Sequence, residues 1–164
     1  MGGVMIVLGI AAGLATGIVI NGDAADTFAI ILTMLVFGAI GFLDDFEKIA
    51  KKNNLGLTAK QKILLQVLLS LGIGLYMILG GNGTDVLIPF VNIYVNFGLL
   101  FMPFVILTEV AMSNGVNLSD GLDGLASSVT LVVAILFAAV GYTHDVYILT
   151  VSGLAIAGSL IGFL

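Results

Sequence analysis

The chain has 164 residues, of which 60% are hydrophobic and only 9% are charged, and its mean hydropathy is +1.23. Soluble domains carry about 25% charged residues, so this composition excludes an ordinary soluble protein and predicts a membrane-embedded one. The chain has no Cys and a single His, His144, which excludes disulfides, thiolate metal sites and a multi-histidine site within this chain.

Six apolar segments are each long enough, with their flanking residues, to cross the membrane as a helix, which takes about 20 apolar residues. They are rich in Gly and Ala, as close helix packing in lipid favours. We therefore predict an all-α polytopic membrane protein that forms a single transmembrane domain over residues 1–164. The expected spans are residues 4–20, 27–43, 63–80, 97–112, 124–141 and 146–164.

The lysines orient these spans. All five basic residues are lysines between positions 48 and 62, and short Lys-rich loops face the cytoplasm. Residues 44–62 are therefore expected inside. By alternation, so are residues 113–123 and both chain ends, whereas residues 21–26, 81–96 and 142–145 are expected outside. Within the outer connection of residues 81–96, the alternation of Asn92, Tyr94 and Asn96 with apolar residues predicts a short outer hairpin.

Two adjacent carboxylates, Asp44 and Asp45, follow the second apolar segment. They could simply mark the end of a span. However, the C-terminal end of a helix disfavours anions by about 0.3–1 kcal/mol for each exposed charge, so the pair calls for a compensating metal ion, lysine or substrate. If the helix continues, Lys48 lies on the same face as both carboxylates. This is either an ordinary surface ion pair or part of a site for lipid phosphate chemistry, in which Lys and Mg²⁺ neutralise phosphates.

The stretch "SNGVNLSDGLDGLA", residues 113–126, lies on the same predicted side as the carboxylate pair. Asp120 is expected to be the N-cap of the fifth span with Asp123 at N3, a carboxylate version of the capping box. Asn114 and Asn117 are not explained by capping, and their amides could bind a ribose, a base or a Mg²⁺ shell. Glu109, expected at the shallow inner end of its span, is either a solvated interfacial acid or a functional one.

These motifs together resemble one family. "MGG" at residues 1–3, "GFLDDFEKIAKKNNLGLTAKQKILLQ" at residues 41–66 and "SNGVNLSDGLDGLA" are similar to the polyprenyl-phosphate N-acetylhexosamine-phosphate transferases. The resemblance extends over nearly the whole chain. Within the family it favours the branch that transfers phospho-N-acetylmuramoyl-pentapeptide from UDP to undecaprenyl phosphate in peptidoglycan synthesis, a Mg²⁺-dependent reaction. The N-acetylglucosamine-phosphate branch is the alternative.

The resemblance also implies roles for individual residues. Asp44 and Asp45 match the acidic pair that serves catalysis or supports the metal. The matching substrate-binding residues, some in the lysine loop and others in the second motif, are Lys48, Lys52, Lys60, Asn117, Asp120, Gly121 and Asp123. The implied partners are the UDP-linked muramoyl pentapeptide, undecaprenyl phosphate, the bilayer of a bacterial cytoplasmic membrane and, in some members, a second copy of the chain. No nucleic-acid partner is expected.

Phe46, Ser119 and Gly115 replace a usual Tyr, Thr and Ala, which are mild departures. The family has ten spans, and this chain resembles the third to the eighth. The resemblance therefore implies that the main Mg²⁺-binding Asp and a histidine-rich loop lie outside the sequence, so we expect part of a longer enzyme. A membrane transporter is the remote alternative, but its polar residues should line the middle of the bilayer, whereas the polar clusters here are predicted at one surface.

Overall fold

The computed structural model describes residues 2–21, 24–50, 56–81, 83–88, 91, 93–119 and 121–164. Within them, helices account for most of the chain, and one two-stranded sheet lies between α3 and α4. The elements are α1 (Gly3–Asn21), α2 (Ala24–Ala50), α3 (Ala59–Leu79), β1 (Asp85–Ile88), β2 (Ile93–Asn96), the 3₁₀ helix η1 (Gly98–Leu100), α4 (Phe101–Ser119), α5 (Leu125–Thr143) and α6 (Tyr147–Phe163).

Five of the described helices are long and apolar enough to cross a membrane, and α6 is apolar with 17 residues, the lower end of the usual range of about 17–25. The predicted all-α architecture is confirmed, and the protein is a multi-pass membrane protein. Two helices extend furthest past the C-terminal ends that the sequence predicted: α2 continues to Ala50 and α4 continues to Ser119. Both extensions carry candidate site residues.

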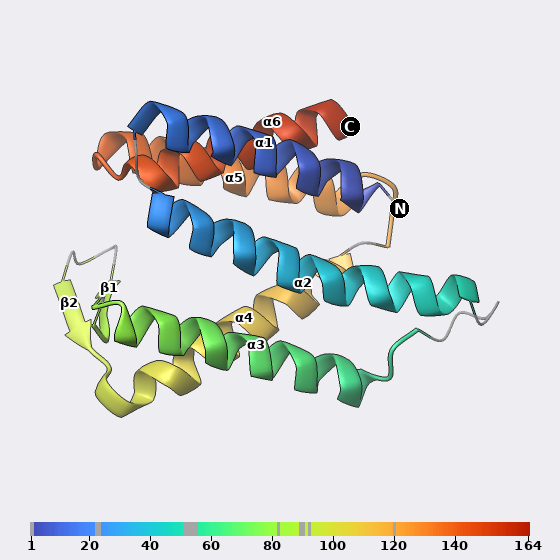
Figure 1. Ribbon diagram of the computed structural model, residues 1–164, viewed down its shortest axis with the longest axis horizontal. Coiled ribbons are helices and arrows are strands. Elements are labelled where there is room, and N and C mark those ends of the chain that lie inside the picture. Colours follow the sequence, from blue (N-terminus) through green and yellow to red (C-terminus); the bar gives the residue numbers. More distant parts are fainter. Residues whose placement is uncertain are drawn as a thin grey trace.

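The helices form two groups with α2 between them (Figure 1). Helix α6 packs against α1 and α5, and α3 packs against α4, while α2 contacts both α1 and α3. Small residues permit the first set of contacts. A Cβ on Gly13 would lie 2.7 Å from the Cβ of Ala155, and a Cβ on Gly153 would lie 2.6 Å from the backbone nitrogen of Ala138. These helices therefore approach backbone to backbone.

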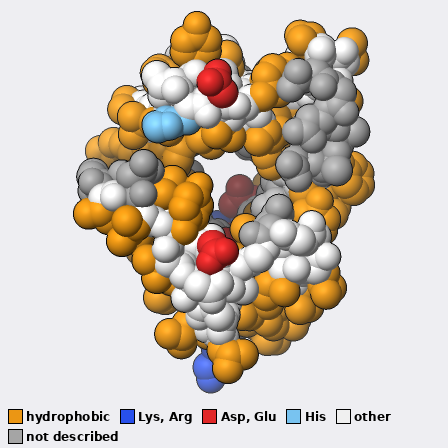
Figure 2. All heavy atoms as spheres, turned by 90° about the vertical axis from the view of Figure 1, so that its left-hand side faces the viewer, with side chains coloured by type: hydrophobic (Ala, Val, Ile, Leu, Met, Phe, Trp, Pro, Cys, Tyr) orange, Lys and Arg blue, Asp and Glu red, His pale blue; other side chains and the backbone are white. Residues whose placement is uncertain are grey.

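The predicted hairpin is present. Strands β1 and β2 pair antiparallel, with Asp85 opposite Asn96 and Ile88 opposite Ile93, and the Asn96 side-chain amide donates to the Asp85 carboxylate at 2.8 Å. The hairpin lies at the end of the bundle where α1 ends and α2 begins (Figure 1). Seen from this end, the molecule has an opening between its helices, with acidic atoms at its lower rim and further acidic atoms in its depth (Figure 2).

Candidate active site

The last turns of α2 carry a cluster of opposite charges. The Nζ atom of Lys48 lies 2.8 Å from Oδ2 of Asp44 and 3.1 Å from Oδ1 of Asp45, as the predicted spacing on one helical face requires. The two carboxylates are not equivalent: the Asp44 side chain is 11% exposed, whereas that of Asp45 is 59% exposed. Asp44 is therefore enclosed by protein, and Asp45 is open to a substrate.

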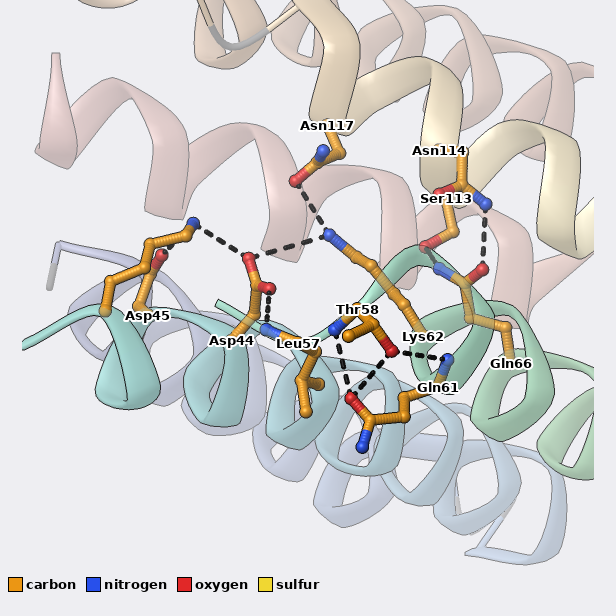
Figure 3. A network of polar contacts seen from close by, with 11 residues as sticks. Asp44, Asp45, Leu57, Thr58, Gln61, Lys62, Gln66, Ser113, Asn114 and Asn117 are labelled. Atoms are coloured by element: carbon orange, nitrogen blue, oxygen red, sulfur yellow. Dashed lines mark hydrogen bonds and ion pairs between the residues drawn. The ribbon is translucent and has the colours of Figure 1, made fainter. Parts of the chain in front are cut away.

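The segment before α3 returns over Asp44. The backbone N–H of Leu57 donates to Oδ1 of Asp44 at 2.9 Å (Figure 3). A Cβ at Gly56 would overlap the Asp44 carboxylate, so glycine at this position lets the backbone pass close to it. Gly56 and Leu57 therefore cover one side of the Asp44 carboxylate, while residues 51–55 lie outside the described part of the chain.

A capping box fixes where α3 begins. The Thr58 hydroxyl accepts from the backbone N–H of Gln61 at 3.4 Å, and the Gln61 side chain accepts from the backbone N–H of Thr58 at 3.0 Å. This reciprocal pair satisfies N–H groups that a helix start leaves unpaired. The pattern T-x-x-Q before an apolar run was present in the sequence, but the sequence analysis did not identify it. The cap holds the neighbouring Leu57 at the point where its N–H reaches Asp44.

Lys62 joins three helices at the site. Its Nζ atom on α3 lies 3.7 Å from Oδ2 of Asp44 on α2 and donates to Oδ1 of Asn117 on α4 at 3.2 Å (Figure 3). Asn117 was predicted as a substrate-binding residue, whereas Lys62 was not among the predicted site residues. The Lys62 side chain is 15% exposed, and a lysine that served only to orient the helices in the membrane would not need to be buried.

A cavity of about 230 Å³ lies next to Lys62, between α2, α3 and α4. Its α2 wall is largely apolar and includes Phe37 and Ile40, and its opposite wall includes Lys62, Gln66 and Asn117. Gln66 is 1% exposed, and it contacts Ser113 and Asn114 on α4 (Figure 3). Asn114 and Asn117 were expected in a loop before a helix, which is wrong: both belong to the last turns of α4. They are held there by partners on α3.

The remaining predicted residues are more dispersed. Gly121 and Asp123 are exposed in the turn between α4 and α5, and Lys60 is exposed in the first turn of α3. Lys52 and Asp120 lie outside the described residues. The expected cap of the fifth span by Asp120, with Asp123 at N3, is wrong because α5 begins at Leu125. Its N-cap is Gly124, whose φ of 77° is left-handed backbone that favours glycine.

Glu109 also lies elsewhere than the sequence predicted. It was expected at the shallow inner end of its span, but the span runs from Gly98 to Ser119 and so places Glu109 near its middle. One Glu109 carboxylate oxygen and the hydroxyl of Ser70 are buried without a hydrogen-bond partner among the described residues. The error arose because the polar residues after Glu109 were read as a loop, whereas they continue the helix.

Whether a carboxylate in this cluster could bind a metal ion depends on how many of its oxygens already contact N–H donors. Among the described residues, no cluster of three His, Cys, Asp or Glu side chains could hold one. Both oxygens of Asp44 already contact N–H donors, from Lys48 and Lys62 on one side and Leu57 on the other. Mg²⁺ often binds through one or two carboxylates together with substrate phosphates, so the exposed Asp45 is the residue of this cluster that fits it.

Comparison with known proteins finds relatives over most of the chain. The chain is 46% identical, over 92% of its length, to a phospho-N-acetylmuramoyl-pentapeptide-transferase of Clostridium beijerinckii. It is 42% identical over its whole length to one of Clostridium botulinum, and 40% identical over 88% of its length to one of Listeria monocytogenes. It covers 47%, 50% and 45% of these relatives, so it spans about half their length. Residues 27–164 match the model of glycosyl transferase family 4, and the chain belongs to this family.

Proposed function

We propose that this chain is part of an enzyme that transfers phospho-N-acetylmuramoyl-pentapeptide from UDP to undecaprenyl phosphate, on the cytoplasmic face of a bacterial cytoplasmic membrane. The observation that carries the proposal is the cluster of Asp44, Asp45, Lys48 and Lys62 at one end of the membrane helices. At that level a soluble nucleotide and the phosphate of a membrane lipid can meet. The relatives of Clostridium beijerinckii and Clostridium botulinum are phospho-N-acetylmuramoyl-pentapeptide-transferases, which supports the muramoyl substrate.

The two lysines bind the phosphates. Each ammonium group contacts two oxygen partners, Asp44 and Asp45 for Lys48, and Asp44 and Asn117 for Lys62. An ammonium group has a further N–H to donate, so both can bind phosphate oxygens without leaving Asp44. Fixed cations of this kind stabilise the charge that grows on the leaving phosphate in the transition state. Asp44 therefore serves as the anchor that keeps both cations at one place.

Asp45 faces the substrate. A phosphate monoester has a second pKa of about 6, so the lipid phosphate is largely deprotonated at neutral pH and needs no dedicated base. Its oxygen attacks the sugar-bound phosphorus of the diphosphate, the bond to the other phosphate breaks, and UMP leaves. Asp45 would hold Mg²⁺, which supplies neutralisation of the diphosphate when bound.

A transfer assay on the full-length enzyme tests the proposal. We expect undecaprenyl phosphate to be converted with UDP-N-acetylmuramoyl-pentapeptide and not with UDP-N-acetylglucosamine, and a chelator to stop the reaction. Product measured from UDP-N-acetylglucosamine alone would contradict the muramoyl assignment, and full turnover in the presence of the chelator would contradict the role of Mg²⁺.

A further inference from the structure

Helices α3 and α4 run antiparallel and meet through polar side chains at regular steps. Lys62 contacts Asn117, and one turn deeper Gln66 contacts Ser113 and Asn114. From Lys62 to Gln66 the contacts advance by one turn along α3, and from Asn117 to Ser113 they move back by one turn along α4. Residues four apart lie on the same face of a helix, so these contacts follow one face of each helix. The contacts made by Lys62 and Gln66 therefore belong to one register between the two helices.

Gln66 makes the more enclosed of these contacts. It is 1% exposed, its Nε2 donates to the Ser113 hydroxyl at 3.0 Å, and its Oε1 accepts from the Asn114 amide at 2.8 Å. The Asn114 amide also donates to the backbone oxygen of Val110 at 2.8 Å, which fixes its own orientation on α4. Burying an amide group without partners is costly, so sliding or rotating α4 against α3 would leave several polar groups unsatisfied.

The register set by Gln66 determines where Asn117 lies. Asn117 is exposed at the end of α4, and among the described residues its hydrogen bond to α3 is the one with Lys62, at 3.2 Å. A single exposed hydrogen bond contributes little to fixing a helix, whereas Gln66, one turn away, contacts two successive α4 residues. Lys62 in turn lies 3.7 Å from Asp44. Gln66 is thus linked through α4 to the position of the second ammonium group of the candidate active site.

We propose that Gln66 is a positioning residue: its amide locks the end of α4 onto α3 and so holds Lys62 between Asn117 and Asp44 in the geometry that turnover needs. The inference rests on the proposed transfer reaction for its kinetic part. Its structural part, the locking of α4, does not depend on which substrate is used.

Three variants of the full-length enzyme separate positioning from simple packing. Gln66→Leu fills a similar volume but removes both amide contacts. Gln66→Glu keeps an oxygen that accepts from Asn114 and can accept from the Ser113 hydroxyl. Ser70→Ala is the matched control, because Ser70 is fully buried one turn further along α3 and its hydroxyl lies against Glu109 rather than against Ser113 or Asn114.

Gln66→Leu is expected to lower kcat by about 10- to 100-fold, since small misplacements of charged groups cost this much, with a much smaller change in KM. Gln66→Glu should recover part of the loss, and Ser70→Ala should behave as the wild type. Unchanged kcat in Gln66→Leu overturns the proposal. So does a Glu variant that is less active than the Leu variant, because packing alone would favour Leu.

A distance measurement supplies the second readout. The chain has no Cys of its own, so once any cysteines elsewhere in the full-length enzyme are replaced, spin labels can be attached to cysteines placed at Leu64 on α3 and Leu118 on α4, which are 60% and 82% exposed. Gln66→Leu should broaden the distance distribution between these labels, and Ser70→Ala should not. An unchanged distribution in Gln66→Leu overturns the locking of α4. If the wild type transfers none of the tested sugars, the proposed function fails, and this measurement alone then decides on the lock.

Discussion

Helices α1, α5 and α6 pack mainly through glycine and small side chains, with hydrogen bonds from Ser159 and Tyr147 to backbone oxygens of α1. Near Asp44, by contrast, α3 and α4 are joined by hydrogen bonds between their side chains. At Gly153 a Cβ would lie 2.6 Å from the nitrogen of Ala138 and 2.7 Å from the oxygen of Ala134, so α6 and α5 meet backbone to backbone. Between α3 and α4 a glycine contact is also present, at Gly74 against Met102, but the end of this interface near Asp44 is made by the side chains of Lys62 and Gln66. Helices therefore associate through different kinds of contact in the two regions.

Small-residue packing is sufficient to hold helices together in a membrane. Side-chain hydrogen bonds between membrane helices add little stability, about 0.6 kcal/mol on average, and a buried charged or amide group is costly if its partner is lost. The polar interface therefore indicates a functional requirement at α3 and α4, and the glycine interface indicates a scaffold. Mutations in the two regions should separate activity from stability.

The largest expected effect is on activity. Asp45→Asn in the full-length enzyme should lower transfer by at least about 100-fold, the lower end of the range for loss of a group that acts in the transition state, because it removes the exposed carboxylate assigned to Mg²⁺ and the diphosphate. Thermal unfolding in detergent should be nearly unchanged, since the Asp45 side chain is 59% exposed.

Two measurements sharpen this prediction. Added Mg²⁺ should restore part of the activity, and raising the pH should not; recovery with pH alone would assign Asp45 to proton transfer instead. Asp85→Asn is the matched control, because Asp85 is an exposed carboxylate that accepts a hydrogen bond from Asn96 in the hairpin at the opposite end of the bundle. Its transfer rate should equal that of the wild type.

Local sequence patterns predicted much of this molecule. The apolar segments and the hairpin followed from composition and alternation, and the contact of Lys48 with Asp44 followed from helical spacing. The contacts of Lys62 could not be predicted in this way, because they join residues on three helices and depend on the register of α3 against α4.

Two boundaries were mispredicted for physical reasons that only the fold reveals. Ser113 and Asn114 interrupt an apolar run, so they were read as the start of a loop, but Gln66 satisfies them inside the bundle and the helix continues. Asp120 and Asp123 match a capping pattern, yet α5 begins after Gly124, which has left-handed backbone. A polar residue in a membrane chain can thus end a helix or find a partner, and the sequence alone does not distinguish these outcomes.

An intermediate effect is expected on stability. Gly153→Ala places a methyl group against the backbone of α5 and should lower the free energy of unfolding by about 1–3 kcal/mol, the usual cost of overpacking. Gly158→Ala is the matched control on the same helix, because a Cβ there meets nothing within 4 Å. It should be neutral or stabilise by up to about 1 kcal/mol through helix propensity.

Unfolding in detergent measures both changes, and the transfer rate per folded molecule should stay at the wild-type value in each. Equal stability of the two variants would show that α5 and α6 do not depend on this close approach. A specific loss of turnover in Gly153→Ala, with the protein still folded, would break the division into a scaffold and a reacting region.

The smallest effect is expected at the start of α3, where one substitution should change both stability and transfer activity. Thr58→Ala removes a capping hydroxyl, which costs about 0.5–2 kcal/mol. It should also loosen Leu57, whose N–H donates to Asp44 at 2.9 Å, so transfer should fall modestly, by less than about tenfold. Thr58→Ser keeps the cap and should restore both properties.

Thr108→Ala is the control for this prediction. Among the described residues, the Thr108 hydroxyl donates only to the carbonyl of Phe104 in its own helix, at 2.8 Å. If Thr58→Ala and Thr108→Ala had the same stability and the same turnover, the cap would have no part in holding the loop over Asp44, and the position of Asp44 would then depend on its two lysines alone.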